Sequence, residues 1–259
     1  MSFILPGMLG VARKAQYSSN YSLDFDGVDD YVTLGTSMKS ILDGATNFSF
    51  ETWIKADSGT SSGGMIFQQE NTDAGDYAHT RVSFVESSAD PFYKLENIFR
   101  TTSGVSNLRT AVLSLGTWHH FVGTFDGSAS GGTHKIYLNG TLDNTATGIG
   151  TAFATSSTNA NARFGTTYIT TRPFDGHIAE FRMWDSTLDA DAITSLYNNP
   201  GIPIDPRENL ANYDSWTGNL VGFWPMETDS GDTVVDLGSG GNDGTKGATG
   251  FPAWSTDSI

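Results

Sequence analysis

The chain has 259 residues, and its 14 Lys and Arg against 29 Asp and Glu make a formal net charge of −15 at pH 7. This length supports a full hydrophobic core, and all-β sandwiches often use it as one domain. The acidic charge argues against nucleic-acid binding, which needs clustered Lys and Arg. The absence of cysteine excludes disulfides, thiolate metal sites and cysteine nucleophiles. No stretch approaches the roughly 18–20 apolar residues of a membrane span.

The first 19 residues contain an apolar stretch, Phe3 to Ala12, followed by Arg13 and Lys14. A signal peptide carries its positive charge before the apolar run, so this order argues against one. We predict that residues 1–19 form a docking arm. Its apolar contacts are Phe3, Ile4 and Leu5. A strand or a tail of the same domain is the alternative.

Alternating apolar and polar residues predict a series of β-strands. In chain order, the clearest are residues 21–26, 48–55, 118–125, 136–142 and 180–184. Within the fourth segment, Asn139-Gly140 predicts a hairpin, because this dipeptide accepts the positive φ angles of a type I′ turn. The segment 118–125 has aromatic residues on both faces, which indicates a strand covered on both sides.

One segment, near residues 189–198, has the pattern of a helix. Asp189 can accept the orphan N–H groups at its start, and Ile193, Leu196 and Tyr197 follow at helical spacing. Gly/Ser/Thr/Asn loops join the other elements. We therefore predict an all-β fold, a jelly-roll β-sandwich of two antiparallel sheets with one short helix.

The composition changes near Pro200, which divides the chain into a sandwich at residues 20–200 and a C-terminal extension at residues 201–259. The run Gly201 to Pro206 has the character of an extended connector. We expect the extension to pack on the sandwich or on a partner. Its candidate partner contacts are Trp216 and Trp254, since Trp is favoured at interface hot spots.

Five segments in order resemble the laminin-G-like domains of the concanavalin A-like lectin/glucanase superfamily. They are Ser22–Val32, Phe48–Lys55, Trp118–Gly127, Lys135–Gly140 and Gly176–Trp184. The resemblance covers roughly residues 20–200 and implies the sandwich fold. It does not specify a function, because the fold hosts lectins, adhesins, glycosidases and structural modules. The order of arm, sandwich and extension also resembles structural proteins of tailed phages.

Two acidic loops are candidate calcium sites, because hard cations bind the carboxylate and carbonyl oxygens of turns. In the first loop, Asp26, Asp29 and Asp30 surround a glycine, and the resemblance implies that a structural ion bridges such a segment to the closing strand near Asp175. The second loop offers Asp236, Asn242 and Asp243. Ordinary turn residues are the alternative in both loops.

The paired carboxylates of a glucanase are missing. In the family pattern they appear as Glu-x-Asp-x-x-Glu on one strand, and no Glu of this chain begins that pattern. The nearest approach, Glu227, Asp229 and Asp232, contains a Ser-Gly turn that points the carboxylates apart. His79, His134 and His177 are isolated in the sequence. We therefore predict that the protein is not an enzyme.

Sugar binding is a third possibility, since sugars stack on aromatic rings and hydrogen-bond to polar groups beside them. Candidate contacts fall in the middle strands, which we expect to line a concave face. They are Tyr77, Arg81, Tyr93, Arg100 and Arg109. Partly exposed aromatic residues are also common on strands that bind nothing.

Together these observations favour a non-enzymatic surface recognition or structural module. We predict a phage virion protein, in a capsid decoration or a tail, located at the virion surface. Its partners would be a capsid or tail shell, a glycan, or further copies of the chain. The alternative is a secreted or surface carbohydrate-binding adhesin module in an extracellular location, with calcium as the cofactor.

Overall fold

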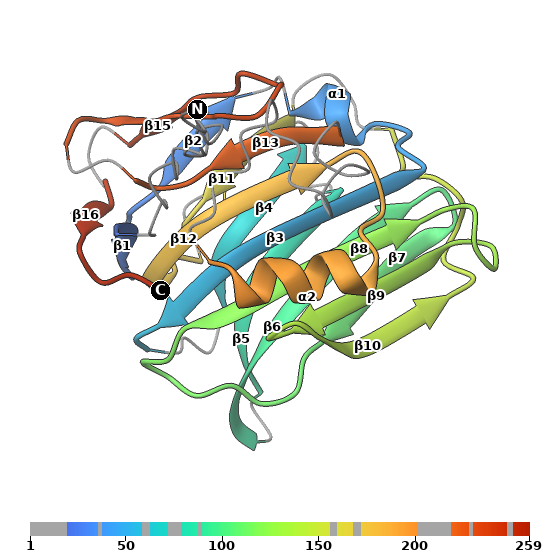
Figure 1. The fold of residues 1–259 in the computed structure, drawn as a ribbon, viewed down its shortest axis with the longest axis horizontal. Helices are drawn as coiled ribbons and strands as arrows, with labels where there is room; N and C mark the ends of the chain where they lie inside the picture. Colours follow the sequence, from blue (N-terminus) through green and yellow to red (C-terminus); the bar gives the residue numbers. More distant parts are fainter. Residues whose placement is uncertain are drawn as a thin grey trace, which may run out of the picture.

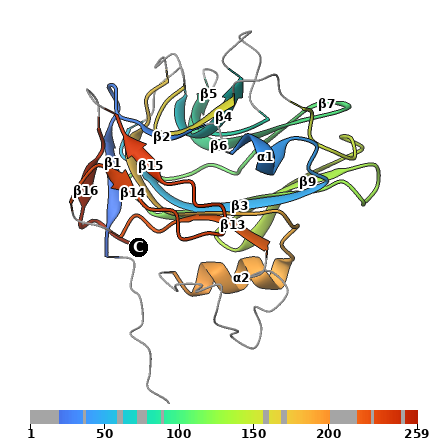
Figure 2. The same cartoon turned by 90° about the horizontal axis from the view of Figure 1, so that it is seen from above.

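A computed structural model of the protein describes residues 20–35, 38–58, 63–71, 79–87, 90–155, 160–167, 172–200, 219–227, 230–247 and 251–259. In these residues, two antiparallel eight-stranded sheets face each other (Figure 1, Figure 2). The predicted β-sandwich is therefore confirmed. Among the described residues, no helix is long and apolar enough to cross a membrane.

Sheet A contains most of the strands that the sequence predicts. Its order is β10 (Thr141–Thr147), β9 (Thr133–Leu138), β8 (His119–Asp126), β3 (Asn47–Ala56), β12 (Asp175–Trp184), β1 (Ser22–Asp26) and β16 (Ala253–Ser255), and β13 (Leu220–Trp224) also pairs with β12.

Sheet B forms the second layer. Its order is β14 (Thr233–Val234), β15 (Gly244–Lys246), β2 (Val32–Gly35), β11 (Ala160–Phe164), β4 (Gly64–Asn71), β5 (Thr80–Ser87), β6 (Asp90–Thr101) and β7 (Gly104–Arg109). The short helix α1 (Lys39–Leu42) follows β2 in the chain.

Phenylalanine side chains from both sheets fill the space between the layers. Phe181 of sheet A has its ring centroid 4.7 Å from that of Phe67 in sheet B and lies parallel to Phe50 at 6.0 Å. All three are fully buried. Burying an apolar side chain of this size contributes about 1.5–3 kcal/mol, so this aromatic layer is a main source of stability.

The predicted helix is α2 (Ala190–Asn198), and the Asp189 carboxylate accepts a hydrogen bond from the Ala192 N–H at 2.8 Å. Ile193 and Leu196 are buried in a second apolar cluster with Val122, Trp184, Leu188 and Phe223. Figure 2 shows α2 on the side of sheet A that faces away from sheet B. The two faces of sheet A are thus covered by the core on one side and partly by α2 on the other.

The hairpin prediction at Asn139-Gly140 is confirmed. Both residues have positive φ angles, 50° and 76°, and Leu138 pairs with Thr141 directly beyond them. The C-terminal extension adds β13 and β16 to sheet A and β14 and β15 to sheet B. Residues 1–19, with Phe3, Ile4 and Leu5, and residue Trp216 lie outside the described residues.

Candidate functional site

The outer face of sheet B is polar and rich in arginine. In β5 and β6 every second side chain enters the core, as Val82, Phe84, Leu95 and Phe99 do. Successive side chains of a strand point to opposite faces, so the residues between them project outward. Strand register then places Gln68, Arg81, Ile98 and Asn107 in one row and Ser83, Glu96 and Arg109 in the next.

Glu96 lies at the centre of this face and is only 3% exposed. Arg109 donates from Nε to its Oε2 at 2.9 Å, and Asn107 donates to the same oxygen at 3.1 Å. Arg81 Nη2 donates to Oε1, also at 3.1 Å. Burial alone would raise the pKa of Glu96, but the hydrogen bonds from Arg109 and Asn107 and the charges of both arginines hold this pKa below its ordinary value. The carboxylate therefore stays ionised and fixes both guanidinium groups.

Among the described residues, three polar atoms beside the Glu96–arginine cluster have no hydrogen-bond partner. They are Gln68 Oε1, Arg81 Nε and Ser83 Oγ, and all three atoms are buried. Buried polar atoms in folded proteins nearly always have a partner, from the protein or from water. Because these three atoms are enclosed by the protein, the donors that a ligand can reach on this part of the face are those of the exposed Arg109 side chain.

Two further arginines extend the face. Arg163 of β11 pairs in register with Gln68, and its guanidinium carbon lies 4.8 Å from the centroid of the Tyr31 ring. Arg100 of β6 pairs with Val105 and is half-buried. Four arginines thus lie on one face of a protein whose net charge is −15.

Three of the predicted sugar contacts, Arg81, Arg100 and Arg109, lie together on this outer face. Tyr93 does not, because its ring stacks on Phe84 at 5.4 Å and packs against the core. Tyr93 is half-buried on the core side of its strand, and its contact with a ligand stays a prediction. Its place in the strand alternation puts it on the same side as Leu95. Tyr77 lies outside the described residues.

The first acidic loop does bring its carboxylates together. One oxygen from each of Asp26, Asp29 and Asp30 lies within 4.8 Å of the others. Burial, followed by the charges of its neighbours, raises the pKa of Asp30, and a cation would relieve that repulsion. Asp175 pairs with Asp26 across β12 and β1, but its carboxylate accepts a hydrogen bond from Ser58. The donor set fits a hard cation, and calcium there stays a prediction.

In the second acidic loop, backbone N–H groups occupy the carboxylate of Asp236. Oδ1 accepts from Phe223 and Gly238, both at 2.8 Å, and Oδ2 accepts from Asn242 at 2.7 Å. Asp243 accepts in turn from the Asp236 N–H. These bonds tie the loop to β13, which assigns Asp236 a structural role and leaves calcium here a prediction.

Trp254, a predicted partner contact, lies in β16 and is half-buried. Its indole N–H donates to the Gly231 carbonyl at 3.0 Å, and the Lys246 ammonium lies 4.8 Å from a ring centroid. The side chain therefore holds parts of the extension together. It also lines an apolar pocket of about 210 Å³ with Val235 and Leu237.

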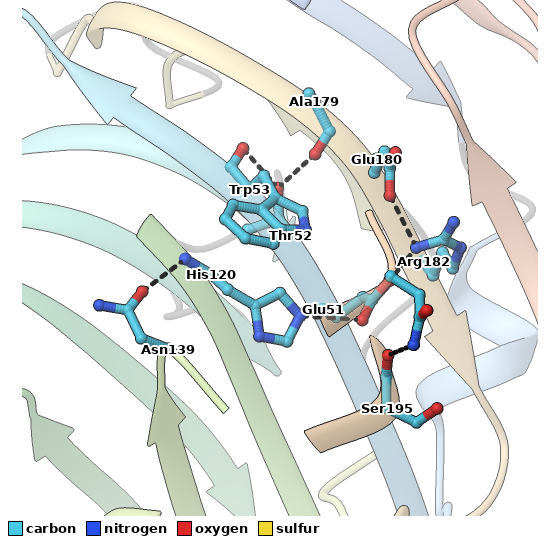
Figure 3. A network of polar contacts seen from close by, with 10 residues as sticks. Glu51, Thr52, Trp53, His120, Asn139, Ala179, Glu180, Arg182 and Ser195 are labelled. Atoms are coloured by element: carbon cyan, nitrogen blue, oxygen red, sulfur yellow. Dashed lines mark hydrogen bonds and ion pairs between the residues drawn. The ribbon is translucent and has the colours of Figure 1, made fainter. Parts of the chain in front are cut away.

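The outer face of sheet A contains a different charged cluster, which lies beneath α2 (Figure 3). Glu51 lies between His120 and Arg182, with 3.1 Å from its Oε2 to His120 Nε2 and a close ion pair to Arg182. Arg182 also contacts Glu180 at 3.1 Å, and its guanidinium carbon lies 4.2 Å from the Phe223 ring centroid. All of these groups are 2% exposed or less, except Phe223 at 3%.

Burial by itself would raise the pKa of Glu51, but the charge of Arg182 and the hydrogen bond from His120 lower it below the ordinary value. The Glu51 carboxylate and the Arg182 guanidinium are therefore ionised although both are buried. Beside it, Trp53 and Trp118 line a pocket of about 470 Å³ with Asn139 and Tyr197, at the C-terminal end of α2.

The sequence offered no signal for Glu96, Gln68 or Ser83. A single glutamate in an alternating strand has the pattern of a solvated surface residue, and only the register of β5, β6 and β7 shows that it lies between two arginines. Arg163 was missed for the same reason, since β11 pairs with β4 across almost 100 residues of chain.

Solved structures with the same fold include a carbohydrate-binding module in complex with a sugar. A Bacteroides ovatus protein assigned to carbohydrate binding has a TM-score of 0.64 and 18% identity, over 93% of this chain and 60% of that protein. A heptameric pentraxin of Limulus polyphemus has a TM-score of 0.53 and 16% identity, over 69% of this chain and 82% of the pentraxin. This chain thus spans about 60% of the length of the first of these proteins.

A third similar structure is the CBM40 of the Ruminococcus gnavus IT-sialidase bound to α2,3 sialyllactose, with a TM-score of 0.52 and 14% identity, over 70% of this chain and 99% of the module. At such identities the likeness concerns the fold alone. No curated protein matches the chain in sequence. The family model of the concanavalin A-like lectin/glucanases superfamily matches residues 26–194, which is more than half of the chain. The protein therefore belongs to this superfamily.

Proposed function

We propose that the protein is a non-enzymatic carbohydrate-binding module, and that the outer face of sheet B binds glycans carrying carboxylate groups. The observation that carries this proposal is the arrangement of Arg81 and Arg109 around the buried Glu96 carboxylate. The Arg109 side chain is 53% exposed even though its Nε and Nη2 are held by Glu96. A cation that is both fixed and open to solvent is suited to binding an anion.

The chemistry of arginine supports an acidic sugar over a neutral one. A guanidinium has five N–H donors in one plane and binds carboxylates in a forked geometry. Glu96 uses only some of these donors and neutralises one of the two charges. The remaining exposed N–H groups of Arg109 offer donors to the carboxylate of such a sugar. The sialyllactose complex of the similar CBM40 supports glycans of this class.

The test is calorimetric titration of the full chain with sialyllactose and with an oligogalacturonate, using lactose as the neutral sugar. Arg109→Gln should weaken binding of the acidic sugar by about tenfold or more, since a charge-assisted hydrogen bond contributes roughly 1.5–3 kcal/mol. The matched control is Lys135→Gln, which removes one positive charge from sheet A. Equal losses in both variants would indicate a general charge effect and would contradict the assignment to this face.

A different outcome would assign sugar binding to the pocket beside α2. If lactose binds as well as sialyllactose, and Trp118→Ala abolishes binding while Arg109→Gln does not, then the aromatic pocket is the sugar site. Its Trp118 and Tyr197 rings and the Asn139 amide have the chemistry of a neutral-sugar site. The proposal for sheet B would then be wrong.

Two sequence predictions are carried forward as proposals. The first is that the module is displayed on a virion through residues 1–19, which deletion of residues 1–15 should separate from glycan binding. The second is a calcium ion held by Asp26, Asp29 and Asp30. Light scattering of the purified chain with and without EDTA tests whether such an ion lies at an interface between copies.

A further inference from the structure

A mixed cluster of one histidine and two aspartates lies at the end of sheet A formed by β1, β12 and the residues after β3. His177 Nε2 is 3.4 Å from Asp57 Oδ2 and 3.8 Å from Asp24 Oδ1. The three candidate ligand atoms all lie within 4.8 Å of one another. His177 is only 6% exposed, so its ring is held in place by the surrounding structure.

Hydrogen bonds on the far side of the ring determine which nitrogen carries the proton. Ser22 Oγ donates its single proton to the Asp257 carbonyl oxygen at 2.7 Å. The same Oγ lies 3.2 Å from His177 Nδ1 and can only accept there. Nδ1 therefore carries a hydrogen, and in the neutral imidazole the lone pair is on Nε2, directed at the two carboxylates.

This arrangement is the one that metal-binding histidines have. A ligating histidine almost always donates its other ring N–H to an oxygen acceptor, which fixes both tautomer and ring orientation. Here the Ser22 hydroxyl oxygen is that acceptor, and the Asp257 carbonyl fixes its orientation by accepting the hydroxyl proton. A lone pair facing two carboxylate oxygens is electrostatically unfavourable without a cation. We propose that Asp24, Asp57 and His177 bind a divalent transition-metal ion of the zinc type.

The distances agree with this assignment. Zinc binds histidine nitrogen and carboxylate oxygen at about 2.0–2.2 Å, so in a tetrahedral site neighbouring ligand atoms lie about 3.4 Å apart. The observed separations from His177 are 3.4 and 3.8 Å. Asp57 already lies at the shorter of these distances, and the Asp24 side chain is 44% exposed, so it has room to move the remaining few tenths of an ångström.

The nearest cation does not occupy the site. Lys55 lies in register beside His177, but its ammonium pairs with the carboxylate of Asp257. Trp118, which donates to that same carboxylate, contacts the His177 ring at 6.1 Å. Three protein ligands leave one coordination position open for water. The site is separate from the arginine face and does not depend on the proposed glycan binding.

The ligand set also distinguishes this cluster from its neighbour at the end of β1. Asp26, Asp29 and Asp30 offer oxygen alone, which suits calcium, whereas imidazole favours zinc and related ions. Asp29 is exposed, as Asp57 is. Asp29→Asn is therefore a matched control for Asp57→Asn, since each variant removes one exposed carboxylate from one of two adjacent clusters.

The experiment is calorimetric titration of the metal-stripped full chain with ZnCl2 and separately with CaCl2. We expect one zinc per chain, a loss of zinc affinity of about tenfold or more in Asp57→Asn, and no change in Asp29→Asn. His177→Gln should abolish zinc binding, and thermal melting without metal shows whether that variant is folded. A crystal of the zinc complex should give an anomalous peak beside His177 Nε2.

Three results would overturn the proposal. The wild-type chain could bind no zinc, in which case His177 is simply an ion-pair partner of the two aspartates. Zinc could bind with the same affinity to wild type and Asp57→Asn, which would place it elsewhere. Calcium could bind as tightly as zinc and be lost with Asp57→Asn, which would make the cluster a hard-cation site.

Discussion

The two outer faces of the sandwich hold the same ion pair, a glutamate and an arginine, in opposite surroundings. On sheet A, Glu51 and Arg182 are both 2% exposed or less and lie beneath α2. On sheet B, the Glu96 carboxylate is equally well buried, but the Arg109 side chain that holds it is 53% exposed. On sheet A both members of the pair are therefore enclosed, whereas on sheet B only the anion is.

This difference indicates which cluster can serve in recognition. A buried charge without a partner is very costly, so the sheet A cluster must remain complete for the protein to fold. A partly exposed arginine keeps hydrogen-bond donors for a ligand, and a buried glutamate limits the conformations it can adopt. We therefore expect sheet A substitutions to act on stability and sheet B substitutions to act mainly on binding.

The largest expected effect comes from Glu51→Gln. The substitution keeps the side chain's shape but leaves Arg182 with Glu180 as its remaining carboxylate partner. We expect the free energy of unfolding to fall by about 3 kcal/mol, near the lower end for breaking a buried ion pair. Urea unfolding measures it. A loss below about 1 kcal/mol would show that the cluster under α2 is not the closed structural unit we describe.

The second-largest expected effect is the pH dependence of stability, because the core between the two sheets disfavours a charged histidine. His134 is fully buried and donates from Nε2 to Asn97 Oδ1, while its Nδ1 lies 2.8 Å from Ser106 Oγ. Burial lowers the pKa of His134 to about 3. Below the unfolded pKa of about 6.5, only the unfolded chain binds this proton, so stability falls as the pH drops from 6.5 towards 3.

At pH 5 this loss amounts to about 2 kcal/mol relative to pH 7, from 1.5 pH units at 1.36 kcal/mol each. Urea unfolding at pH 7 and pH 5 measures it. His134→Gln removes the titrating ring, so its stability difference between the two pH values should shrink by that amount. An unchanged pH dependence in this variant would mean that His134 is protonated in the folded protein.

Glu96→Gln makes the same change on the outer face of sheet B, and we expect it to reduce the free energy of unfolding by less than Glu51→Gln does. Arg109 can turn to water, and only Arg81 loses its partner in a largely buried place. We expect a loss of between about 1 and 2 kcal/mol, together with weaker sugar binding because the guanidinium groups are no longer fixed. If Glu96→Gln destabilises the chain more than Glu51→Gln, the contrast between the two faces fails.

The smallest expected effect concerns α2, the helix that covers part of sheet A. Asp189→Ala removes the side chain that accepts the Ala192 N–H at the start of α2. Loss of such a cap costs about 1 kcal/mol. The same variant should accelerate amide hydrogen exchange in residues 190–194, while exchange in β6 stays unchanged. Faster exchange in both places would point to a global loss of stability.

Much of the fold could be predicted because its signals are local. Asp189 and the Asn139-Gly140 turn each depend on a few neighbouring residues, and the structure shows both as expected. The strand segments were evident from alternation. The short strands β14, β15 and β16 of the extension were not, because two or three residues carry no period and form strands only through pairing with β15, β2 and β1.

The candidate sites were predicted less well because they join distant parts of the chain. Tyr93 was predicted as a ligand contact because it lies in an alternating strand. Alternation does not show which residues of a strand face the core, and Tyr93 is one of those that do. His177 was isolated in the sequence. Its neighbours Asp24, in β1, and Asp57, directly after β3, come more than 100 residues earlier, and only sheet A brings them together.

The position of β1 has a consequence for how the protein is made. β1 lies between β12 and β16, and Leu23 pairs with Ile178 on one side and Trp254 on the other. A ribosome has therefore produced the chain as far as Trp184 before β1 can acquire β12, and nearly all of the described chain before it can acquire β16. Until then, its hydrogen-bonding groups and its buried Leu23 and Phe25 remain open to chaperones and to other nascent chains.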